Sequence, residues 1–393
     1  MSPQSAPQCD RSTVAVTARL PFDRVLDQVL SAVAALAGAG GDDAVPLVLL
    51  ARALAWTEEQ TAVAVTQAIA ADWLEGPIER PRLAARIRTG AVVGLDLGGT
   101  KLIGAVADMT GRVLHEIQEA TWNGHDGAAF DQIIDMTHRL AALAGLPVSA
   151  LSGVSVGVPG AVSGSGTVSL APNLKIGAGT GLVQRLSAGL GVAARVENDV
   201  NIAAFGEYWR GEARGVTSLA FLALGTGVGM GLVLDGVIYR GETGGAGEIG
   251  YLPVGAAPLT NAPHRGGGYF EDMVGSEGIR SRYGSDVTVR EIFARAEGGE
   301  AKACTVIEQT AKDTALGVAG IAMLLDPALI VLGGGIGSRA KFAAMVEQKA
   351  RHLAPTVCPI VPSTLGSRAG LIGAVMLALT DARRNGCAED VAA

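Results

Sequence analysis

The sequence predicts an α/β protein of two similar halves that follow a small helical region. Two observations carry this prediction. An apolar run at 92–107 is broken by Gly98-Gly99-Thr100-Lys101 and then resumes, which is typical of two short buried strands joined by a glycine turn. The same order of apolar strand, Gly-Thr-Gly turn and returning strand occurs at 219–239. We therefore expect a duplicated fold rather than a single dinucleotide-binding unit.

Length and composition fit a soluble enzyme. With 393 residues, 49% of them hydrophobic, the chain is long enough for two or three domains with real cores. A net charge of −7 gives no general attraction to nucleic acid or acidic membranes. The apolar stretch 315–325 is too short to span a bilayer, and no signal-peptide pattern is recognised. No CxxC pair or disulfide-like spacing links Cys9, Cys304, Cys358 and Cys387. We expect a cytoplasmic protein without a membrane partner.

The first 90 residues are expected to form a flexible tail, 1–20, and a helix-turn-helix-like domain of degenerate winged-helix type, 21–90. Thr57 is a good N-cap, and Gln60 three residues later completes a capping box. Apolar spacing indicates three helices, at 22–36, 45–56 and 58–74.

The charge of the third helix speaks against DNA binding. A reader helix presents basic or amide side chains near its N-terminus, whereas this helix presents Glu58 and Glu59. Residues 1–90 hold eight Arg, no Lys and ten Asp or Glu, a formal charge of −2, so contact with phosphates would be repulsive. A small docking domain and a DNA-binding domain both remain open. The basic run Arg80, Arg82, Arg86 and Arg88 has three interpretations: a wing, a linker that contacts phosphates, or a solvated face.

The first glycine turn has the composition of a phosphate-binding turn. Gly98 and Gly99 carry no Cβ atom, so the backbone N–H groups of the turn are able to close on an anion. Thr100 adds a hydroxyl, Lys101 a cation, and Asp96 a carboxylate suited to holding Mg²⁺ through water. An ordinary glycine hairpin is the alternative.

A second candidate group follows in the first half. We expect a strand at 111–120, a helix at 128–143 and a strand at 152–158 that enters a turn ending at Gly160. Asp199 then follows a short apolar run and opens a helix at 202–210. It is either a capping residue or, at a junction of strand and helix, a well-placed general base.

The second half repeats the turn and adds another. A strand at 219–224 enters Gly225-Thr226-Gly227, which is not a clean GxGxxG and so argues against dinucleotide binding. The region 288–325 is largely helical, and a strand at 328–332 enters Gly333, Gly334 and Gly335, a turn that allows close approach of a flat adenine ring. A strand at 360–363 and a helix at 370–380 close the chain.

Six motifs in this order resemble the ROK family of sugar kinases and sugar-responsive repressors, over about 91–382. They are LDLGGTK at 95–101, GVPG at 157–160, PNL at 172–174, ENDVN at 197–201, GTGVG at 225–229 and LDPALIVLGGGIG at 325–337. The resemblance implies a duplicated actin-like (RNase H-like) ATPase fold, with an N-terminal lobe at 91–200 and a C-terminal lobe at 201–393 around a cleft.

The resemblance also implies a site. Asp199 would take the proton from the attacking sugar hydroxyl. The ATP phosphates would lie at the turns of Gly98 and Gly225, the adenosine at Gly333–Gly335, and Mg²⁺ near Asp96. The sugar would be held by Asn198, Glu248 and Glu271, with Asn173 and Gly160 nearby.

One departure concerns zinc. Many family members carry ExGH followed by a site of one His and three Cys, but here Tyr251 takes the place of that His. The stretch 261–271 has no cysteine, and His264 alone cannot form a tetrahedral site. We predict no structural zinc, and Tyr251 is able to donate a hydrogen bond to a sugar hydroxyl.

Three functions follow for the chain. The favoured one is ATP-dependent phosphorylation of a hexose or a hexose-like polyol, such as an amino sugar or a cyclitol. The alternatives are a sugar-responsive transcriptional regulator that binds DNA through its N-terminal domain, and a catalytically idle member whose N-terminal domain binds a protein. The resemblance also suggests a homodimer.

Overall fold

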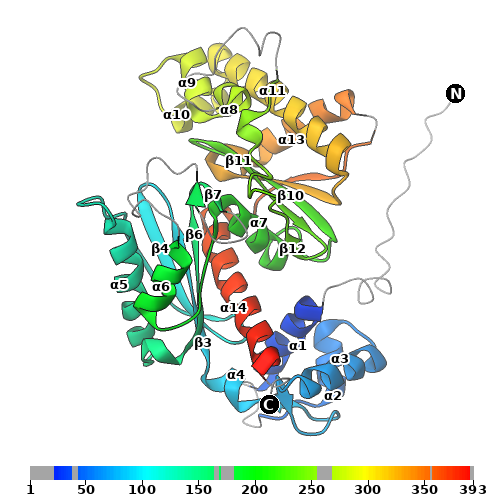
Figure 1. Ribbon diagram of the computed structural model, residues 1–393. Helices are drawn as coiled ribbons and strands as arrows, with labels where there is room; N and C mark the ends of the chain where they lie inside the picture. Colours follow the sequence, from blue (N-terminus) through cyan, green and yellow to red (C-terminus); the bar gives the residue numbers. More distant parts are fainter. Residues whose placement is uncertain are drawn as a thin grey trace, which may run out of the picture. The chain divides into compact units, whose positions relative to one another are not determined.

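The computed structural model describes residues 22–37, 43–162, 168–169, 181–254, 268–354 and 356–389. The chain forms two compact units, 1–83 and 84–393 (Figure 1). None of the described helices is both long enough and apolar enough to cross a membrane.

The first unit consists of three helices followed by a hairpin. The helices are α1 (Phe22–Ala37), α2 (Leu47–Leu54) and α3 (Glu58–Ala70), and the antiparallel strands are β1 (Leu74–Glu75) and β2 (Arg82–Leu83). The predicted capping box at Thr57 is confirmed. The third helix ends at Ala70 rather than at 74, because Asp72 has a left-handed φ of 55° and the buried Trp73 turns the chain into β1.

The hairpin β1–β2 adds two short strands to the three helices predicted for the first region. Arg82 of the basic run lies in β2, opposite Glu75 of β1, and its Nε lies 2.9 Å from the Glu75 carboxylate. At least this arginine has an acidic partner within the hairpin, while its side chain stays half exposed.

The second unit contains two sheets of the same topology. The first has the order β5-β4-β3-β6-β9, with β3 (Ala91–Leu97) antiparallel to β4 (Lys101–Asp108) and parallel to β6 (Leu151–Val158). The second has the order β12-β11-β10-β13-β14, with β10 (Ser218–Leu224) antiparallel to β11 (Val228–Leu234) and parallel to β13 (Leu329–Gly333). Each sheet is a three-stranded meander extended by two parallel strands, so the predicted duplication is confirmed.

The remaining strands complete these sheets. The returning strand predicted at the end of 219–239 is divided, because Asp235 and Gly236 both have positive φ and form a tight turn before β12. The outer strands are β5 (Val113–Ala120), β9 (Ala194–Asn198), β12 (Val237–Ile238) and β14 (Ile360–Pro362), and a separate pair is formed by β7 (Ala161–Val162) and β8 (Val168–Ser169).

Helices cover both sheets. A short helix, α4 (Ala85–Thr89), precedes β3, and the first sheet carries α5 (Ala128–Leu143) and α6 (Leu182–Leu190) on one face, with the C-terminal helix α14 (Ala369–Glu389) against β3 and β6 on the other (Figure 1). The helices of the second half are α8 (Tyr269–Val274), α9 (Ser276–Tyr283), α10 (Val289–Glu297), α11 (Ala301–Leu325), α12 (Gly334–Gly337) and α13 (Ala340–Leu353). Single 3₁₀ turns lie at Val148–Ala150, Ile249–Tyr251 and Gly366–Arg368.

Two helices join the sheets. Helix α7 (Asp199–Arg210) packs against β10 and β11 of the second sheet and also against α14, which lies on the first sheet. The two helices approach so closely that a Cβ atom on Gly206 would lie 2.3 Å from the Ala369 carbonyl oxygen, and one on Gly373 would lie 1.7 Å from that of Ile202. Glycine is therefore required at this crossing, and the chain returns to its first sheet at its C-terminal end.

Candidate functional site

Four carboxylates from separate segments of the second unit form a row in which each one interacts electrostatically with the next. Asp199 at the start of α7 interacts with Asp96 at the end of β3 and with Glu248, which precedes the turn Ile249–Tyr251. Glu248 in turn interacts with Glu271 of α8. The structure thus brings together residues that are up to 175 positions apart (271 − 96).

Asn198, and not Asp199, caps helix α7. The Asn198 Oδ1 accepts the N–H groups of Val200 and Asn201, each at 2.9 Å, and its Nδ2 donates to the Gly160 carbonyl at 2.9 Å. The capping interpretation of Asp199 is therefore wrong, because strand β9 pairs with β6 up to Asn198 and the helix starts one residue later. With Oδ1 engaged, the remaining amide hydrogen of Asn198 is what this side chain has to offer a ligand.

The environment of Asp199 favours its protonated form. Burial raises its pKa from 3.8 to about 7, and the negative charge of Asp96 adds to this rise. A hydrogen bond from the Val200 N–H to Asp199 Oδ1, 2.9 Å long, opposes it. A carboxyl group with a pKa near neutrality is matched to accepting a proton at physiological pH.

Asp96 lies between the first glycine turn and the C-terminal helix. Burial raises its pKa to about 6, against the opposing effect of the Lys101 cation. Its carboxylate fills the space beside Gly370, since a Cβ atom there would lie 2.2 Å from Asp96 Oδ2. A residue larger than glycine at position 370 would displace the carboxylate.

The two candidate phosphate turns occupy equivalent places in the two sheets. The first links β3 to β4, and the second links β10 to β11. At the tip of the first, Gly99 and Thr100 are exposed, while Thr121 Oγ1 donates to the Gly98 carbonyl at 2.8 Å. At the tip of the second, Thr226 and Gly227 are exposed.

In both turns a side-chain hydroxyl donates a hydrogen bond to a glycine carbonyl, while other positions of the turn have free space around them. In the second turn the Ser276 hydroxyl and N–H donate to the Gly225 carbonyl at 2.8 and 2.9 Å. A Cβ atom on Gly99 or on Gly225 would have no other heavy atom within 4 Å.

Glu271 lies against the second turn. Its Oε2 accepts the Val228 N–H at 2.9 Å, and a Cβ atom on Gly227 would lie 3.1 Å from the same oxygen. One carboxylate oxygen therefore orders the turn. The role that the resemblance implies for Glu271, holding a sugar hydroxyl, stays a prediction for the carboxylate as a whole.

The other expected site residues have different surroundings. Burial and the charge of Glu271 raise the pKa of Glu248. The Tyr251 side chain is half exposed, at 51%. Gly334 and Gly335 are exposed at the start of α12, directly after β13. Asn173 and His264 lie outside the described residues, so their expected roles and the absence of zinc stay predictions.

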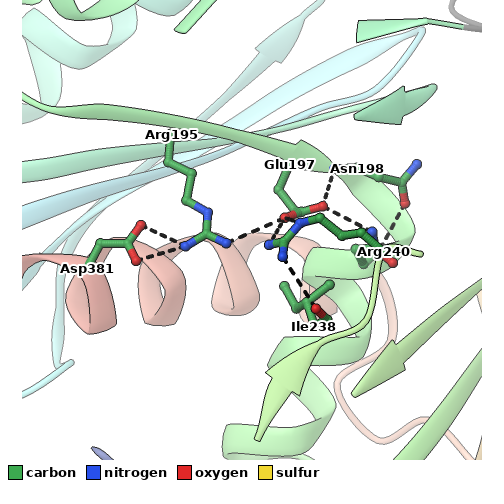
Figure 2. A network of polar contacts seen from close by, with 7 residues as sticks. Arg195, Glu197, Asn198, Ile238, Arg240 and Asp381 are labelled. Atoms are coloured by element: carbon green, nitrogen blue, oxygen red, sulfur yellow. Dashed lines mark hydrogen bonds and ion pairs between the residues drawn. The ribbon is translucent and has the colours of Figure 1, made fainter. Parts of the chain in front are cut away.

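Glu197 is a functional candidate that sequence reasoning missed. Its side chain is 1% exposed, and its Oε2 accepts Arg240 Nε at 2.8 Å and also Arg240 Nη2. Its Oε1 accepts the Asn198 N–H at 3.1 Å and Asn201 Nδ2 at 3.0 Å (Figure 2). Glu197 is the first residue of the ENDVN segment, but a glutamate in a sequence indicates burial only when its partner is known, and Arg240 lies 43 positions away.

The residues present fit Mg²⁺ and ATP. Asp96 and Asp199 are neighbouring, partly buried carboxylates, and the charge of Asp96 raises the cost of ionising Asp199, which a divalent cation would relieve. Within the described ranges no three His, Cys, Asp or Glu residues are grouped as a metal site. Mg²⁺ keeps several waters in proteins and binds through one or two carboxylates and substrate phosphates, which is the donor set that Asp96 and Asp199 offer.

The model of the ROK family matches residues 92–381. Among curated proteins, the chain is 31% identical over 311 residues to the bifunctional enzyme NanE/NanK of Brucella melitensis, covering 78% of this chain but only 57% of that protein. The chain thus spans little more than half of that relative's length. It is also 31% identical to the N-acetyl-D-glucosamine kinase of Salmonella arizonae, covering 73% of this chain and 99% of the kinase.

Two solved structures are informative. A ROK family glucokinase from Streptomyces griseus, solved with glucose and AMPPNP, has a TM-score of 0.60 at 26% identity and covers 74% of this chain and 99% of the glucokinase. A ROK family transcriptional regulator, described as a homolog of the E. coli MLC protein, has a TM-score of 0.70 at 20% identity and covers 92% of this chain and 98% of its own. The second likeness concerns the fold alone.

Proposed function

The chain belongs to the ROK family, and on this premise we propose that it transfers a phosphoryl group from ATP to a hydroxyl of a hexose or hexose-like polyol. The observation that carries the proposal is the group of carboxylates centred on Asp199, whose pKa lies near 7, between two glycine turns of equivalent position. The 31% identity to an N-acetyl-D-glucosamine kinase supports the same reaction class.

In the proposed mechanism Asp199 accepts the proton of the attacking hydroxyl. Phosphoryl transfer asks little covalent chemistry of a protein, so positioning and one proton acceptor account for most of the residues needed. Glu248 and Asn198 would hold hydroxyls of the sugar, with Tyr251, Glu271, Gly160 and Asn173 as further contacts.

ATP would lie with its phosphates at the turns of Gly98–Lys101 and Gly225–Gly227 and its adenine at Gly333–Gly335. Asp96 would hold Mg²⁺ through water, and the ion supplies neutralisation of the phosphate charge when bound. The exposed tips of both turns support this assignment. We also propose that the protein acts as a cytoplasmic homodimer.

The test is ATP turnover with a panel of glucose, N-acetyl-D-glucosamine, other amino sugars and cyclitols. We expect phosphorylation of at least one compound, and a loss of about 10²- to 10⁴-fold in kcat for Asp199→Asn. Asp131→Asn, on the exposed surface of α5, is the matched control and should keep full activity. Unchanged turnover in Asp199→Asn would remove Asp199 as the base.

A second candidate function, sugar-responsive DNA binding, is supported by two observations. The fold of the regulator covers 92% of this chain, which exceeds the 74% covered by the glucokinase. The hairpin β1–β2 directly after α3 also has the position of a wing. Against it stand Glu58 and Glu59, both exposed in the first turn of α3. Binding to the promoter DNA of its own gene, with affinity that falls steeply with salt, would favour the regulator.

A further inference from the structure

We propose that Arg240 is a positioning residue that, through Glu197, fixes the general base relative to the sugar-binding loop. The inference rests on the proposed function for what Asp199 and Glu248 do. Its physical content is a link between two segments, one from each half of the duplicated fold. In this proposal neither Arg240 nor Glu197 contacts the substrate.

Glu197 holds the start of helix α7. One carboxylate oxygen accepts the N–H of Asn198, the cap of the helix, and the side-chain amide of Asn201 in its first turn. Asp199 is the first residue of that helix and lies between these two attachment points. The orientation of the Asp199 carboxylate therefore depends on where the Glu197 carboxylate lies.

Arg240 holds the loop that leads to Glu248. Its side chain donates to the other oxygen of Glu197 through Nε, at 2.8 Å, and through Nη2. Its own backbone carbonyl accepts the Ala246 N–H at 3.0 Å, which closes the loop two residues before Glu248. The Gly247 carbonyl next accepts the Met230 N–H at 2.9 Å, so the closed loop is fixed to β11.

The charges assign this task to Arg240 rather than to the neighbouring Arg195. Arg195 Nη1 donates to both oxygens of Asp381, at 2.8 and 2.9 Å, and its Nη2 is 3.7 Å from Glu197. Figure 2 shows Arg195 between Asp381 and Glu197, and Arg240 on the other side of Glu197. Because Asp381 balances Arg195, Arg240 is the main counter-charge of a carboxylate that is 1% exposed.

The chain offers a matched control for this link. Arg195 and Arg240 are similarly exposed, at 30% and 21%, and both lie on Glu197. Only Arg240 is also bound to the loop that leads to Glu248, because its backbone carbonyl accepts the Ala246 N–H. Arg195→Met therefore removes a partly buried cation from the same cluster without breaking the link, whereas Arg240→Met removes a partly buried cation and also breaks the link.

The experiment compares Arg240→Met, Arg240→Lys and Arg195→Met in the full chain. For Arg240→Met we expect kcat/KM for the sugar to fall about 10- to 100-fold, with KM for ATP changed less than about twofold. Arg240→Lys should be intermediate, since lysine keeps the charge but not the two-donor geometry. Arg195→Met should stay within about threefold of the parent chain, and Glu197→Gln combined with Arg240→Met should be no worse than Arg240→Met alone.

A readout without ligand separates this inference from the proposed function. Amide hydrogen exchange should be at least about tenfold faster in Arg240→Met, both at 241–248 and at 198–201, and unchanged at both in Arg195→Met. If the chain phosphorylates no sugar but shows this exchange pattern, the kinase proposal fails and the link stands. If exchange at the two segments is unchanged, or if Arg195→Met and Arg240→Met respond alike, the link is overturned.

Discussion

Asp199→Asn should cost activity and at the same time stabilise the protein. Burial and the charge of Asp96 raise the pKa of Asp199 from 3.8 to about 7, which means that the folded chain holds the ionised form at a cost. At about 1.4 kcal/mol per pH unit, this rise corresponds to about 4 kcal/mol. Part of it belongs to the repulsion with Asp96 and would be shared in a coupled titration, so we expect about 2–3 kcal/mol.

The gain has a defined pH window. Because the folded-state pKa lies above 3.8, the folded chain binds more protons than the unfolded chain between about pH 4 and pH 7. The parent protein therefore loses stability as pH rises through this range, whereas the asparagine variant does not. The difference in free energy of unfolding should be near zero at pH 4 and complete above pH 7.

Scanning calorimetry of both chains between pH 4 and pH 8 measures this difference. With roughly 2 °C per kcal/mol for a unit of this size, the variant should melt about 4–6 °C higher at pH 8. Asp199 also lies in the first turn of α7, where a negative charge gains about 0.3–1 kcal/mol from the helix dipole. A variant that melts lower than the parent at pH 8 would show that the dipole outweighs burial, and would refute the reasoning.

Three further predictions follow from the same structure. The kcat/KM for the sugar should rise with pH to a plateau, with an apparent midpoint near 7, because activity needs the ionised form of a carboxyl pair whose pKa values are raised; a flat profile between pH 5.5 and 8 contradicts this. Gly370→Ala should lower kcat about 10- to 100-fold with a small change in melting temperature, since the new Cβ pushes the Asp96 carboxylate aside. Gly153→Ala, whose Cβ would meet its nearest atom at 3.7 Å, is the control, and equal losses in both variants would argue against displacement of Asp96. Thr57→Ala should destabilise the first unit by about 1 kcal/mol in urea unfolding, Thr57→Ser should not, and identical midpoints for both would mean that the capping box contributes nothing.

The sequence predicted best what short-range patterns determine. Helix α5 has the predicted bounds, and the hairpin β3–β4 and the meander strand β5 lie where apolar runs and glycines indicated. The turn at Asp235-Gly236 was also readable, as an Asp-Gly pair between two apolar runs, but the long returning strand concealed it.

The features that the sequence did not predict depend on contacts between residues that are far apart in the chain. Asn198 and Asp199 are both favoured caps, and only the pairing of β9 with β6 decides which one starts the helix. The glutamate at 197 gave no sign of burial, because its charge is balanced by an arginine from the other half of the fold. The approach of Gly370 to Asp96 likewise depends on a helix that returns from the end of the chain.

The return of α14 to the first sheet has a consequence for synthesis on the ribosome. Strands β3 and β6 are complete by residue 158, yet the helix that covers one of their faces ends at Glu389. At about 5–20 residues per second, that apolar face waits at least roughly ten seconds for its cover. The nascent chain therefore passes through a stage in which the first sheet is exposed on one side, and chaperone binding should concentrate there until α14 has been synthesised.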